Sequence, residues 1–410
     1  MSRKYSENIL KILGISFGFA VGFVLLEIIS RILPASDTFS QKLPQKCKSQ
    51  ITSYLEVDHD CLFQRTSRYE GVYTKGKFPP FPVKAFKKAN DIGQFTDVDF
   101  STIVDINSKI VPIISIGDSY VEALQVPNQE TYHGLLNNYI SEDEKIIKST
   151  AIGTSGNPLS QYLISTMYAS KHISNTKAIY IYSIVSNDFD ESILGKSLVQ
   201  YGGRFKLNDE DQNEIVFINR NLSFLVKIRR LIFKYSALLR YLAINLEISS
   251  AAYKFPFCFI ADFPCEQIIN FKANIIDSNE SEDKNRFEFS YKASDIFLSE
   301  VGKLRKTPLK RKNTIFVIDA DRNPIYDKSL LESEYFKKQR NYFIKKAKEY
   351  GFTVIDMKYI FADHYKKNKQ KFEFSNDPHW NTLGHKIITA AIAKELNFKL
   401  KSKKEIKNLP

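Results

Sequence analysis

The sequence has little of what metal centres and redox sites are built from. Among 410 residues there are four cysteines and six histidines, with no Cys-x-x-Cys pair and no histidines spaced to complete a zinc site. No Gly-x-Gly-x-x-Gly turn and no lysine-bearing phosphate loop is present, which argues against nucleotide binding. Internal repeats and low-complexity tracts are also absent. No metal or organic cofactor is therefore implied.

Charge and composition limit the partners. Hydrophobic residues make up 43% of the chain and aromatic residues 13%, enough for a core in one large domain or two smaller ones. The formal net charge is +13, with small basic clusters at 303–312, 366–371 and 399–407. Because no zinc-finger or RNA-binding signature accompanies them, we do not expect a nucleic-acid partner. A solvated basic surface, or attraction to anionic lipid or an acidic polymer, fits better.

The N-terminal segment has the composition of a membrane anchor. An apolar run extends from Ile12 to Leu33, close to the ~20 residues that cross a bilayer as a helix. Glu27 and Arg31 interrupt it near one end, where a helix lets residues four apart pair. Basic residues precede the run and favour a cytoplasmic N-terminus: Arg3, Lys4 and Lys11. A cleaved signal peptide is the alternative, although Pro34-Ala35-Ser36 is a poor cleavage site. We predict a single-pass membrane anchor at 1–35 and an extracytoplasmic remainder.

The positions of the cysteines are consistent with export of the chain beyond the apolar run. All four lie beyond the apolar run, in two pairs that are close in sequence: Cys47 with Cys61, and Cys258 with Cys265. Such pairs indicate two short loops closed by disulfides in an oxidising compartment. Four unpaired, buried thiols are the alternative.

The rest of the chain divides into a loop-rich extension and an α/β domain. Residues 36–109 are interpreted as a linker and N-terminal extension, 110–398 as the domain, and 399–410 as a basic tail. Strands are expected at Ile110–Ile116, Lys145–Ile152, Ala178–Val185, Ile315–Asp319 and Phe352–Asp356. Helices are expected at Glu130–Ile140, Ser160–Ser170, Ser333–Tyr350 and Leu383–Leu396. This alternation predicts a parallel sheet with helices on both faces.

The alternation breaks between about 200 and 310, which is interpreted as a helical insertion. Its strongest helix candidate, Leu222–Leu246, carries several basic residues among phenylalanine, leucine and isoleucine. The plain interpretation is a core-packing helix with a solvated basic edge. The alternative is a basic amphipathic segment that lies on the membrane or caps a site.

Gly117-Asp118-Ser119-Tyr120 follows the first strand of the domain. A serine in this place lies at the carboxyl edge of the sheet, where open α/β folds bind ligands. If Ser119 begins a helix, its own N–H and the helix dipole favour a developing oxyanion. An ordinary N-capping serine is the alternative.

A nucleophilic serine needs a base, and His379 is the best candidate. Asp377 precedes it by two residues, so a bent loop can aim the carboxylate at Nδ1 and leave Nε2 free for the serine proton. A surface turn with an incidental histidine is the alternative. Among the other histidines, His364 is interpreted as a surface residue, His133 as a packing residue and His385 as a buttress of the loop.

Two polar loops follow the next two strands. Ile152–Pro158 offers backbone N–H groups without obstructing side chains, and Ser186-Asn187-Asp188 offers a side-chain amide. Each alone is a plain turn. At successive strand ends, the two loops are suited to binding an oxyanion.

These four segments resemble the four blocks of the SGNH/GDSL hydrolase superfamily. The matching blocks are Gly117-Asp118-Ser119, Ser155-Gly156-Asn157, Ser186-Asn187-Asp188 and Asp377-Pro378-His379. The resemblance implies a flavodoxin-like α/β/α sandwich with a five-stranded parallel sheet. It also implies a triad of Ser119, His379 and Asp377, and an oxyanion hole formed by the N–H groups of Ser119 and Gly156 and the amide of Asn187. The usual glycine near Ser186 is missing, and the acid precedes the histidine by two residues, whereas many GDSL esterases have three.

The ending Asp-x-His-Trp followed by a glycine is similar to that of SGNH domains in bacterial polysaccharide O-acetylation proteins. The resemblance covers roughly 110–200 and 310–396. It implies a membrane-anchored serine esterase or O-acyltransferase that acts on an acylated cell-envelope carbohydrate, with polysaccharide assembly machinery as a further partner. A catalytically inactive, anchored glycan-binding or assembly protein with the same fold is the alternative.

Overall fold

A computed structural model describes most of the chain. The described residues are 2–33, 35–37, 47–63, 65–76, 83–104, 109–173, 177–194, 202–207, 214–218, 224–246, 280–375 and 377–401. They belong to two compact units. The first unit draws on 1–40, 71–85 and 222–272, and the second, the sandwich unit, on 41–70, 86–221 and 273–410.

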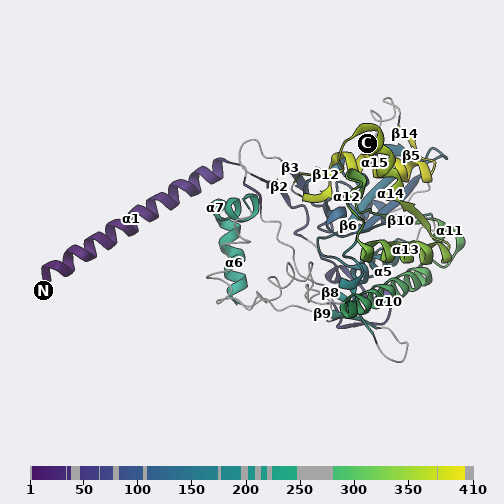
Figure 1. Ribbon diagram of the computed structural model, residues 1–410, viewed down its shortest axis with the longest axis horizontal. Helices are drawn as coiled ribbons and strands as arrows, with labels where there is room; N and C mark the ends of the chain where they lie inside the picture. Colours follow the sequence, from purple (N-terminus) through teal and green to yellow (C-terminus); the bar gives the residue numbers. More distant parts are fainter. Residues whose placement is uncertain are drawn as a thin grey trace. The chain divides into compact units, whose positions relative to one another are not determined.

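A central sheet of seven strands organises the sandwich unit (Figure 1). Its strands are β4 (Ile110–Gly117), β5 (Tyr139–Ile140), β6 (Ile146–Gly153), β7 (Ile179–Ile184), β10 (Thr314–Ile318), β11 (Thr353–Asp356) and β14 (Lys399–Leu400). Their order across the sheet is β11-β10-β7-β4-β6-β5-β14. The five strands from β11 to β6 pair in parallel. Numbered along the chain they run 2-1-3-4-5, which is the flavodoxin-like order. The predicted fold is therefore confirmed, with two short antiparallel strands added at one edge.

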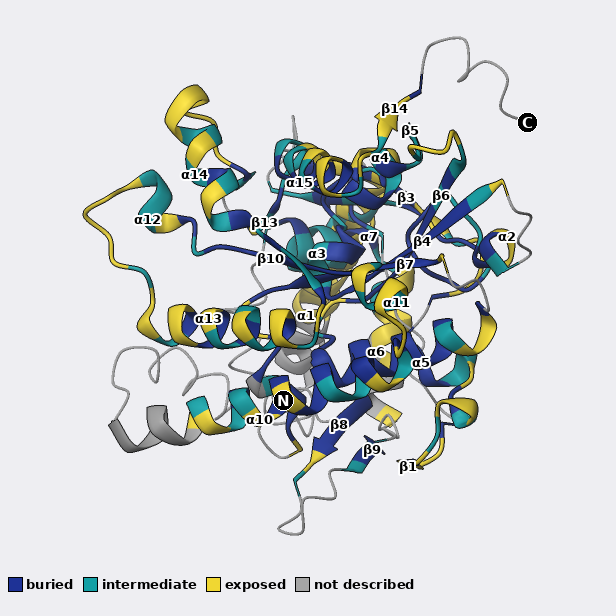
Figure 2. Ribbon diagram, turned by 90° about the vertical axis from the view of Figure 1, so that its right-hand side faces the viewer, coloured by how far each residue is buried: buried dark blue, intermediate teal, exposed yellow. Residues whose placement is uncertain are grey.

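Helices cover both faces of this sheet. One face carries α5 (Leu159–His172), α10 (Glu280–Leu304) and α13 (Glu334–Glu349). The other carries α4 (Tyr132–Leu136), α14 (Met357–Asn368) and α15 (Thr382–Glu395). Successive strand residues point to opposite faces, so Tyr182 and Phe316 belong to the first apolar cluster while Ile181 and Val317 belong to the second. Figure 2 shows the central strands as buried between these layers.

β4 lies at the middle of the sheet because its residues are almost all apolar and β-branched. Ile113, Ile114 and Ile116 are fully buried. Pro112 lacks an N–H, and β4 pairs with β7 only from Ile113 onward. The proline therefore stands outside that ladder and is compatible with a central strand.

Shorter elements complete the sandwich unit. Three small sheets lie apart from the central one. They are β1 (Gln50–Ile51) with β9 (Glu214–Ile218) and β8 (Gly202–Lys206), β2 (Glu70–Lys75) with β3 (Val83–Lys88), and β12 (Glu373–Phe374) with β13 (Asp377–Trp380). The pair β2–β3 includes residues of both units. The short helices are α2 (Phe100–Val104), α3 (Ser119–Glu122), α11 (Pro308–Lys312) and α12 (Asn323–Tyr326), and the 3₁₀ turns are η1 (Tyr54–Glu56), η2 (His59–Cys61), η3 (Asn128–Glu130) and η4 (Asp190–Ser192).

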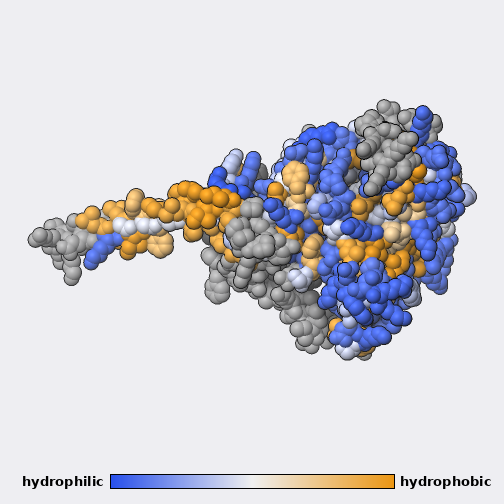
Figure 3. Space-filling view, turned by 90° about the horizontal axis from the view of Figure 1, so that it is seen from above, coloured by the Kyte–Doolittle hydropathy of each residue, from blue (hydrophilic) through white to orange (hydrophobic). Residues whose placement is uncertain are grey.

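The first unit contains most of β2 and part of β3, and its other described elements are helical. It contains α1 (Ser2–Ile32), α6 (Phe224–Tyr235), α7 (Ala237–Arg240) and a π-helical turn, η5 (Tyr241–Asn245). Within α1, Leu10–Ile32 is long and apolar enough to cross a membrane, by length and composition alone. Figure 3 shows this helix as a largely apolar surface. Arg31 Nε lies 3.0 Å from Glu27 Oε1, so the predicted ion pair is confirmed.

Several predicted elements differ from the structure. The helix predicted for Leu222–Leu246 breaks at Ser236, whose extended backbone and side chain cap α7. The helix predicted for Glu130–Ile140 is a 3₁₀ turn, the short α4 and then strand β5. The segment 200–310, predicted as a helical insertion, includes strands β8 and β9, and its helix α10 packs on α5 and α13 within the sandwich. α14 was not predicted.

One of the two predicted disulfides lies within the described residues. Cys47 and Cys61 are bonded, 14 residues apart in sequence, as predicted. Cys258 and Cys265 lie outside the described residues, as does most of the predicted basic tail. A disulfide and an N-terminal apolar helix together indicate a secreted or extracytoplasmic location.

Candidate active site

Ser119 lies directly beyond the buried end of β4. A Cβ added at Gly117 would meet Val121 Cγ2 at 2.2 Å, so this turn has no room for a larger residue. Asp118 caps the following helix, because its Oδ1 accepts from the N–H of Tyr120 at 2.9 Å. Its Oδ2 accepts from the Ser119 hydroxyl at 3.2 Å. Burial raises the pKa of the Asp118 carboxyl. The helix that begins at Ser119, α3, is a single turn of four residues, so its dipole is weak.

The loops that carry Gly156 and Asn187 leave the sheet beside Ser119. β4 lies between β6 and β7, and the ends of β4 and β6 are in register. Gly156 has a φ of +80°, which favours glycine. Asn187 is exposed in the turn after β7, which Asp188 holds by accepting from the N–H of Val185 at 2.7 Å. Three neighbouring strand ends thus bring the candidate oxyanion donors to one edge of the sheet.

Asp377 and His379 lie in β13, a short strand paired with β12, where a bent loop was expected. The Asp377 Oδ1 accepts hydrogen bonds from the ring Nδ1–H of His379 and from its backbone N–H, the latter at 2.9 Å. Burial alone would raise the pKa of Asp377, but these hydrogen bonds outweigh it and hold the pKa well below its ordinary value. With its Nδ1 proton held by a carboxylate, the imidazole presents Nε2 as the proton acceptor. In the described part of the chain, no side chain hydrogen-bonds Nε2 of His379.

Gln125 holds the second carboxylate oxygen of Asp377. Its amide Nε2 donates to Asp377 Oδ2 at 3.0 Å and lies 3.1 Å from Nδ1 of His379. A carboxylate only accepts, so the amide nitrogen must be the atom that faces Asp377. The other end of the amide, Oε1, is buried and has no hydrogen-bond partner among the described residues. Gln125 therefore orients the acid–histidine pair and leaves its own carbonyl oxygen unsatisfied.

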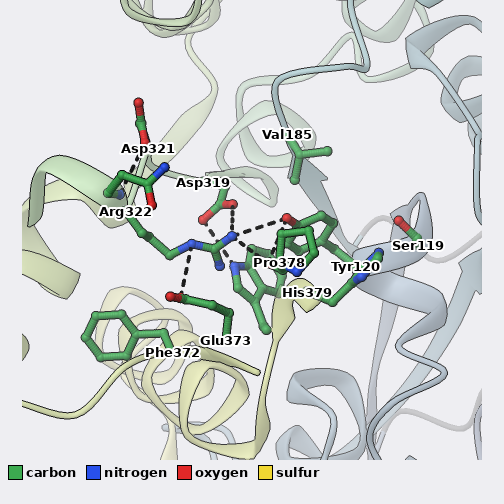
Figure 4. A network of polar contacts seen from close by, with 12 residues as sticks. Ser119, Tyr120, Val185, Asp319, Asp321, Arg322, Phe372, Glu373, Pro378 and His379 are labelled. Carbon is green, nitrogen blue, oxygen red and sulfur yellow. Dashed lines mark hydrogen bonds and ion pairs between the residues drawn. The ribbon is translucent and has the colours of Figure 1, made fainter. Parts of the chain in front are cut away.

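The carbonyl oxygen of Pro378 is held from two sides. It accepts from the hydroxyl of Tyr120 at 3.0 Å and from Nη2 of Arg322 at 2.6 Å. Figure 4 shows the Arg322 guanidinium between Asp319 and Glu373, which lie 3.6 and 3.5 Å from it. Burial would lower the pKa of Arg322, but Asp319, Tyr120 and Glu373 raise it, so the group stays charged. The backbone between Asp377 and His379 is thereby fixed.

The neighbouring tryptophan joins the same network. Trp380 is buried, and its Nε1–H donates to Asp319 Oδ1 at 3.1 Å. Its ring lies edge-on to Tyr120, with centroids 4.8 Å apart, and edge-on to His385 at 5.7 Å. His385 is buried and accepts from the N–H of Tyr132 at 3.2 Å, in agreement with its predicted role as a buttress.

A buried lysine supports the loop that contains Gln125. Lys87 comes from β3, in the N-terminal extension, and its Nζ donates to the carbonyls of Ala123 and Val126, both at 2.9 Å. Burial lowers the pKa of Lys87 to about 7, with a further contribution from the charge of Arg65. The extension thus packs beneath the site and fixes the segment after α3.

A buried ion pair supports the glycine loop. Glu122, in α3, pairs with Arg65, and both side chains are almost fully buried. Its second oxygen, Oε2, accepts from the N–H of Ser155 at 2.9 Å and from the Ser155 hydroxyl. The residue next to Gly156 is therefore tied to the helix that begins at Ser119.

The fold places Ser119 near the strand that carries Asp377 and His379, but it does not join the serine to the histidine. α3 packs against β13, and the ring of Tyr120 lies 4.8 Å from that of His379, centroid to centroid. The Ser119 hydroxyl donates to Asp118, and within the described residues it makes no hydrogen bond to His379. Asp377 and His379 are hydrogen-bonded as predicted. His133 is buried, in agreement with a packing role. No group of three or more His, Cys, Asp or Glu side chains in the described residues is placed to hold a metal ion.

Sequence reasoning missed most of the side chains that support the predicted residues. The positions of Tyr120 and Asp319 could have identified them from the sequence. Tyr120 follows Ser119, and Asp319 is the polar residue after a buried strand. Gln125 and Arg322 carried no such signal. They lie in segments without periodicity, and the Gln125–Asp377 contact joins residues 252 positions apart.

Comparisons with known proteins give only distant matches. No protein-family model matches the sequence, and no curated protein matches it. Among solved structures, the acetyl xylan esterase AlAXEase is 12% identical, with a TM-score of 0.35, covering 69% of this chain and 98% of its own. Axe2, an acetylxylan esterase from Geobacillus stearothermophilus, is 10% identical, with a TM-score of 0.34 and coverages of 72% and 97%. LAE5, an alpha/beta hydrolase from the metagenome of Lake Arreo, is 11% identical, with a TM-score of 0.36 and coverages of 73% and 100%. At these TM-scores the fold assignment depends on the strand order alone.

Proposed function

We propose that the chain is a serine-dependent esterase or O-acyltransferase, with Ser119 as nucleophile, His379 as base and Asp377 as the acid that orients the base. One observation carries this function most strongly. A buried carboxylate holds the Nδ1 proton of His379, whose side chain is 22% exposed, in a strand that packs against the helix beginning at Ser119. This leaves Nε2 of the imidazole as the available proton acceptor.

The chemistry proceeds in two steps. Nε2 of His379 takes the hydroxyl proton as Ser119 Oγ attacks an ester carbonyl, and the tetrahedral oxyanion accepts from the N–H groups of Ser119 and Gly156 and the amide of Asn187. The histidine then gives its proton to the leaving alcohol, and an acyl-serine remains. Water completes an esterase cycle by displacing the acyl group as an acid, whereas a sugar hydroxyl completes a transferase cycle by forming a new ester. In both cycles His379 deprotonates the incoming hydroxyl and returns the proton to Ser119.

The Ser119 hydroxyl must leave Asp118 to react. Its donor bond to Asp118 Oδ2 and the proposed bond to His379 cannot form together, since a hydroxyl has one proton. Rotation about the serine side-chain bond exchanges one acceptor for the other. Catalytic hydrogen bonds are often long in unliganded sites and tighten when substrate binds.

The proposed substrate is an ester on a cell-envelope carbohydrate. α1 supports a single-pass anchor with the sandwich unit outside the cytoplasm, because basic residues precede the apolar run and Cys47 is disulfide-bonded to Cys61. The net charge of +13 favours an acidic polymer. Polysaccharide assembly machinery is the further partner that this location suggests.

A catalytically inactive, anchored glycan-binding protein is the second candidate, favoured by the bond from Ser119 to Asp118. Hydrolysis of p-nitrophenyl acetate by the purified protein, with and without a polysaccharide acceptor, separates the possibilities. The esterase predicts nitrophenol release in water alone, the transferase predicts release that depends on the acceptor, and both predict loss in Ser119→Ala. If the parent protein and Ser119→Ala both release nitrophenol only at the background rate under all conditions, the result would support the inactive glycan-binding protein.

A further inference from the structure

Helix α6 presents an apolar face that nothing in the described structure covers. The residues of this face are Phe224, Ile228, Leu231, Ile232 and Tyr235. Their spacing places them on one side of a helix with 3.6 residues per turn. Their exposed fractions range from 36% at Ile228 to 74% at Phe224. Five large apolar residues exposed in one stripe form a contiguous patch, which a soluble surface does not ordinarily show.

Positive charge accompanies this apolar face. The α6 sequence, FLVKIRRLIFKY, contains four basic residues and no acidic one. Lys234 is exposed, and its ammonium lies 5.4 Å from the ring centroid of Tyr235. An apolar face next to basic side chains is the pattern of helices that lie in the headgroup layer of anionic membranes. Tyr235 suits the same layer, since its ring is apolar and its hydroxyl is polar.

The end of α6 is tied to the end of the candidate membrane span. Arg31 in α1 donates from Nη2 to the carbonyl of Tyr235 at 2.8 Å. Glu27 accepts from the Ser236 hydroxyl at 2.8 Å and from the N–H of Ala237 at 2.9 Å, which are the cap and first residue of α7. Figure 1 shows α7 beside this end of α1, with α6 next to α7. A carboxylate in an apolar span needs a partner, and here the free N–H groups at the start of α7 provide it.

We propose that α6 lies in the headgroup layer of an anionic lipid leaflet, with its apolar face towards the acyl chains. Two observations select lipid as the occupant. The apolar face is tied by direct hydrogen bonds to α1, whose own apolar side chains from Leu10 to Ile32 are exposed. The basic residues of α6 complement the negative charge of anionic headgroups. Glu27 and Arg31 then connect α1 to the end of α6 and hold α6 at the membrane surface. This role is independent of the chemistry at Ser119.

A tryptophan reporter tests this placement in the full-length protein. The chain has one tryptophan, Trp380, which is 1% exposed and so provides a low background. Leu231→Trp places an indole on the apolar face. Phe233→Trp places one two residues further on, roughly 200° around the helix, and serves as the matched control. Each protein is reconstituted in vesicles of phosphatidylcholine and phosphatidylglycerol with brominated acyl chains.

We expect the brominated lipid to quench Leu231→Trp several-fold more than Phe233→Trp or the parent protein. Quenching of Leu231→Trp no stronger than that of the parent overturns the placement. Red-shifted emission would then put this face in water, and blue-shifted emission would put it against protein, either another segment of this chain or a second copy. Equal thermal midpoints of the variants and the parent establish that the helix is intact.

A charge variant tests the choice of anionic lipid. Lys234→Glu, made in the Leu231→Trp background, should reduce the quenching in vesicles that contain phosphatidylglycerol and leave it unchanged in pure phosphatidylcholine. Lys358→Glu, a change of the same charge in the sandwich unit, is the control and should change neither. The same quenching in both lipids, before and after Lys234→Glu, would overturn the anionic preference.

Discussion

Replacing Gln125 with methionine isolates one hydrogen bond to the Asp377–His379 pair. The amide donates to Asp377 Oδ2 at 3.0 Å, and methionine has a similar length but cannot donate. A hydrogen bond to a charged group contributes about 1.5–3 kcal/mol. The variant also removes the buried Oε1, which has no partner in the part of the chain that the structure describes and so opposes folding by about 1 kcal/mol or more. The two effects oppose each other in the free energy of unfolding, which should change little.

Catalysis should change far more than stability. Asp377 is proposed to orient His379 and to stabilise the imidazolium that forms. Loss of the hydrogen bond from Gln125 should therefore raise the activation free energy, and kcat should fall about 10- to 150-fold. KM should change little, since Gln125 acts through Asp377. The assay is initial-rate hydrolysis of p-nitrophenyl acetate beside a thermal unfolding scan. Gln129→Met, in the exposed turn nearby, is the control and should keep the parent rate. Parent activity in Gln125→Met would refute the reasoning.

Three further variants test the supports of the site. The pKa of Lys87 is about 7 in the native state and about 10.5 in the unfolded chain. Between these two pH values only the unfolded chain binds the proton, so the free energy of unfolding of the parent should rise by about 1.4 kcal/mol per pH unit. Lys87→Met should not show this rise, which is checked by measuring unfolding midpoints from pH 7 to 10. The same dependence of stability on pH in the variant and the parent would contradict the prediction. Glu122→Gln leaves the charge of Arg65 buried without its partner. The free energy of unfolding, measured by chemical denaturation, should fall by about 3–5 kcal/mol. A fall of less than about 1 kcal/mol would show that the ion pair contributes little. Replacing Cys47 and Cys61 together by alanine should cost about 3 kcal/mol in chemical denaturation, because the 14-residue loop gains freedom in the unfolded state; a loss under about 1 kcal/mol would contradict this.

The sheet could be predicted because its strands carry a local pattern. β4, β7 and β10 are short runs rich in apolar, β-branched residues. β4 ends at Gly117, β10 is followed by Asp319, and the first polar residue after β7 is Ser186, beyond Val185. The strand order followed from the resemblance to known hydrolases. Pro112 fitted as well, since the pairing of β4 with β7 begins one residue later.

Other features depend on contacts between distant residues and so left no local pattern. The predicted helix over Leu222–Leu246 breaks at Ser236, whose hydroxyl caps α7 and donates to Glu27, more than 200 positions earlier in the chain. The Asp377–His379 segment is a strand because β12 pairs with it, which no local signal indicates. Gln125 and Lys87 act at the site only through residues brought close by the tertiary fold.

The most direct test of the central claim is mass spectrometry of the protein after reaction with a fluorophosphonate. The account predicts a single adduct, on the peptide that contains Ser119. It also predicts that His379→Ala abolishes the reaction, because this variant lacks the base proposed to take the hydroxyl proton. No adduct on the parent protein, or the same rate of labelling in His379→Ala, would contradict a serine nucleophile activated by this histidine.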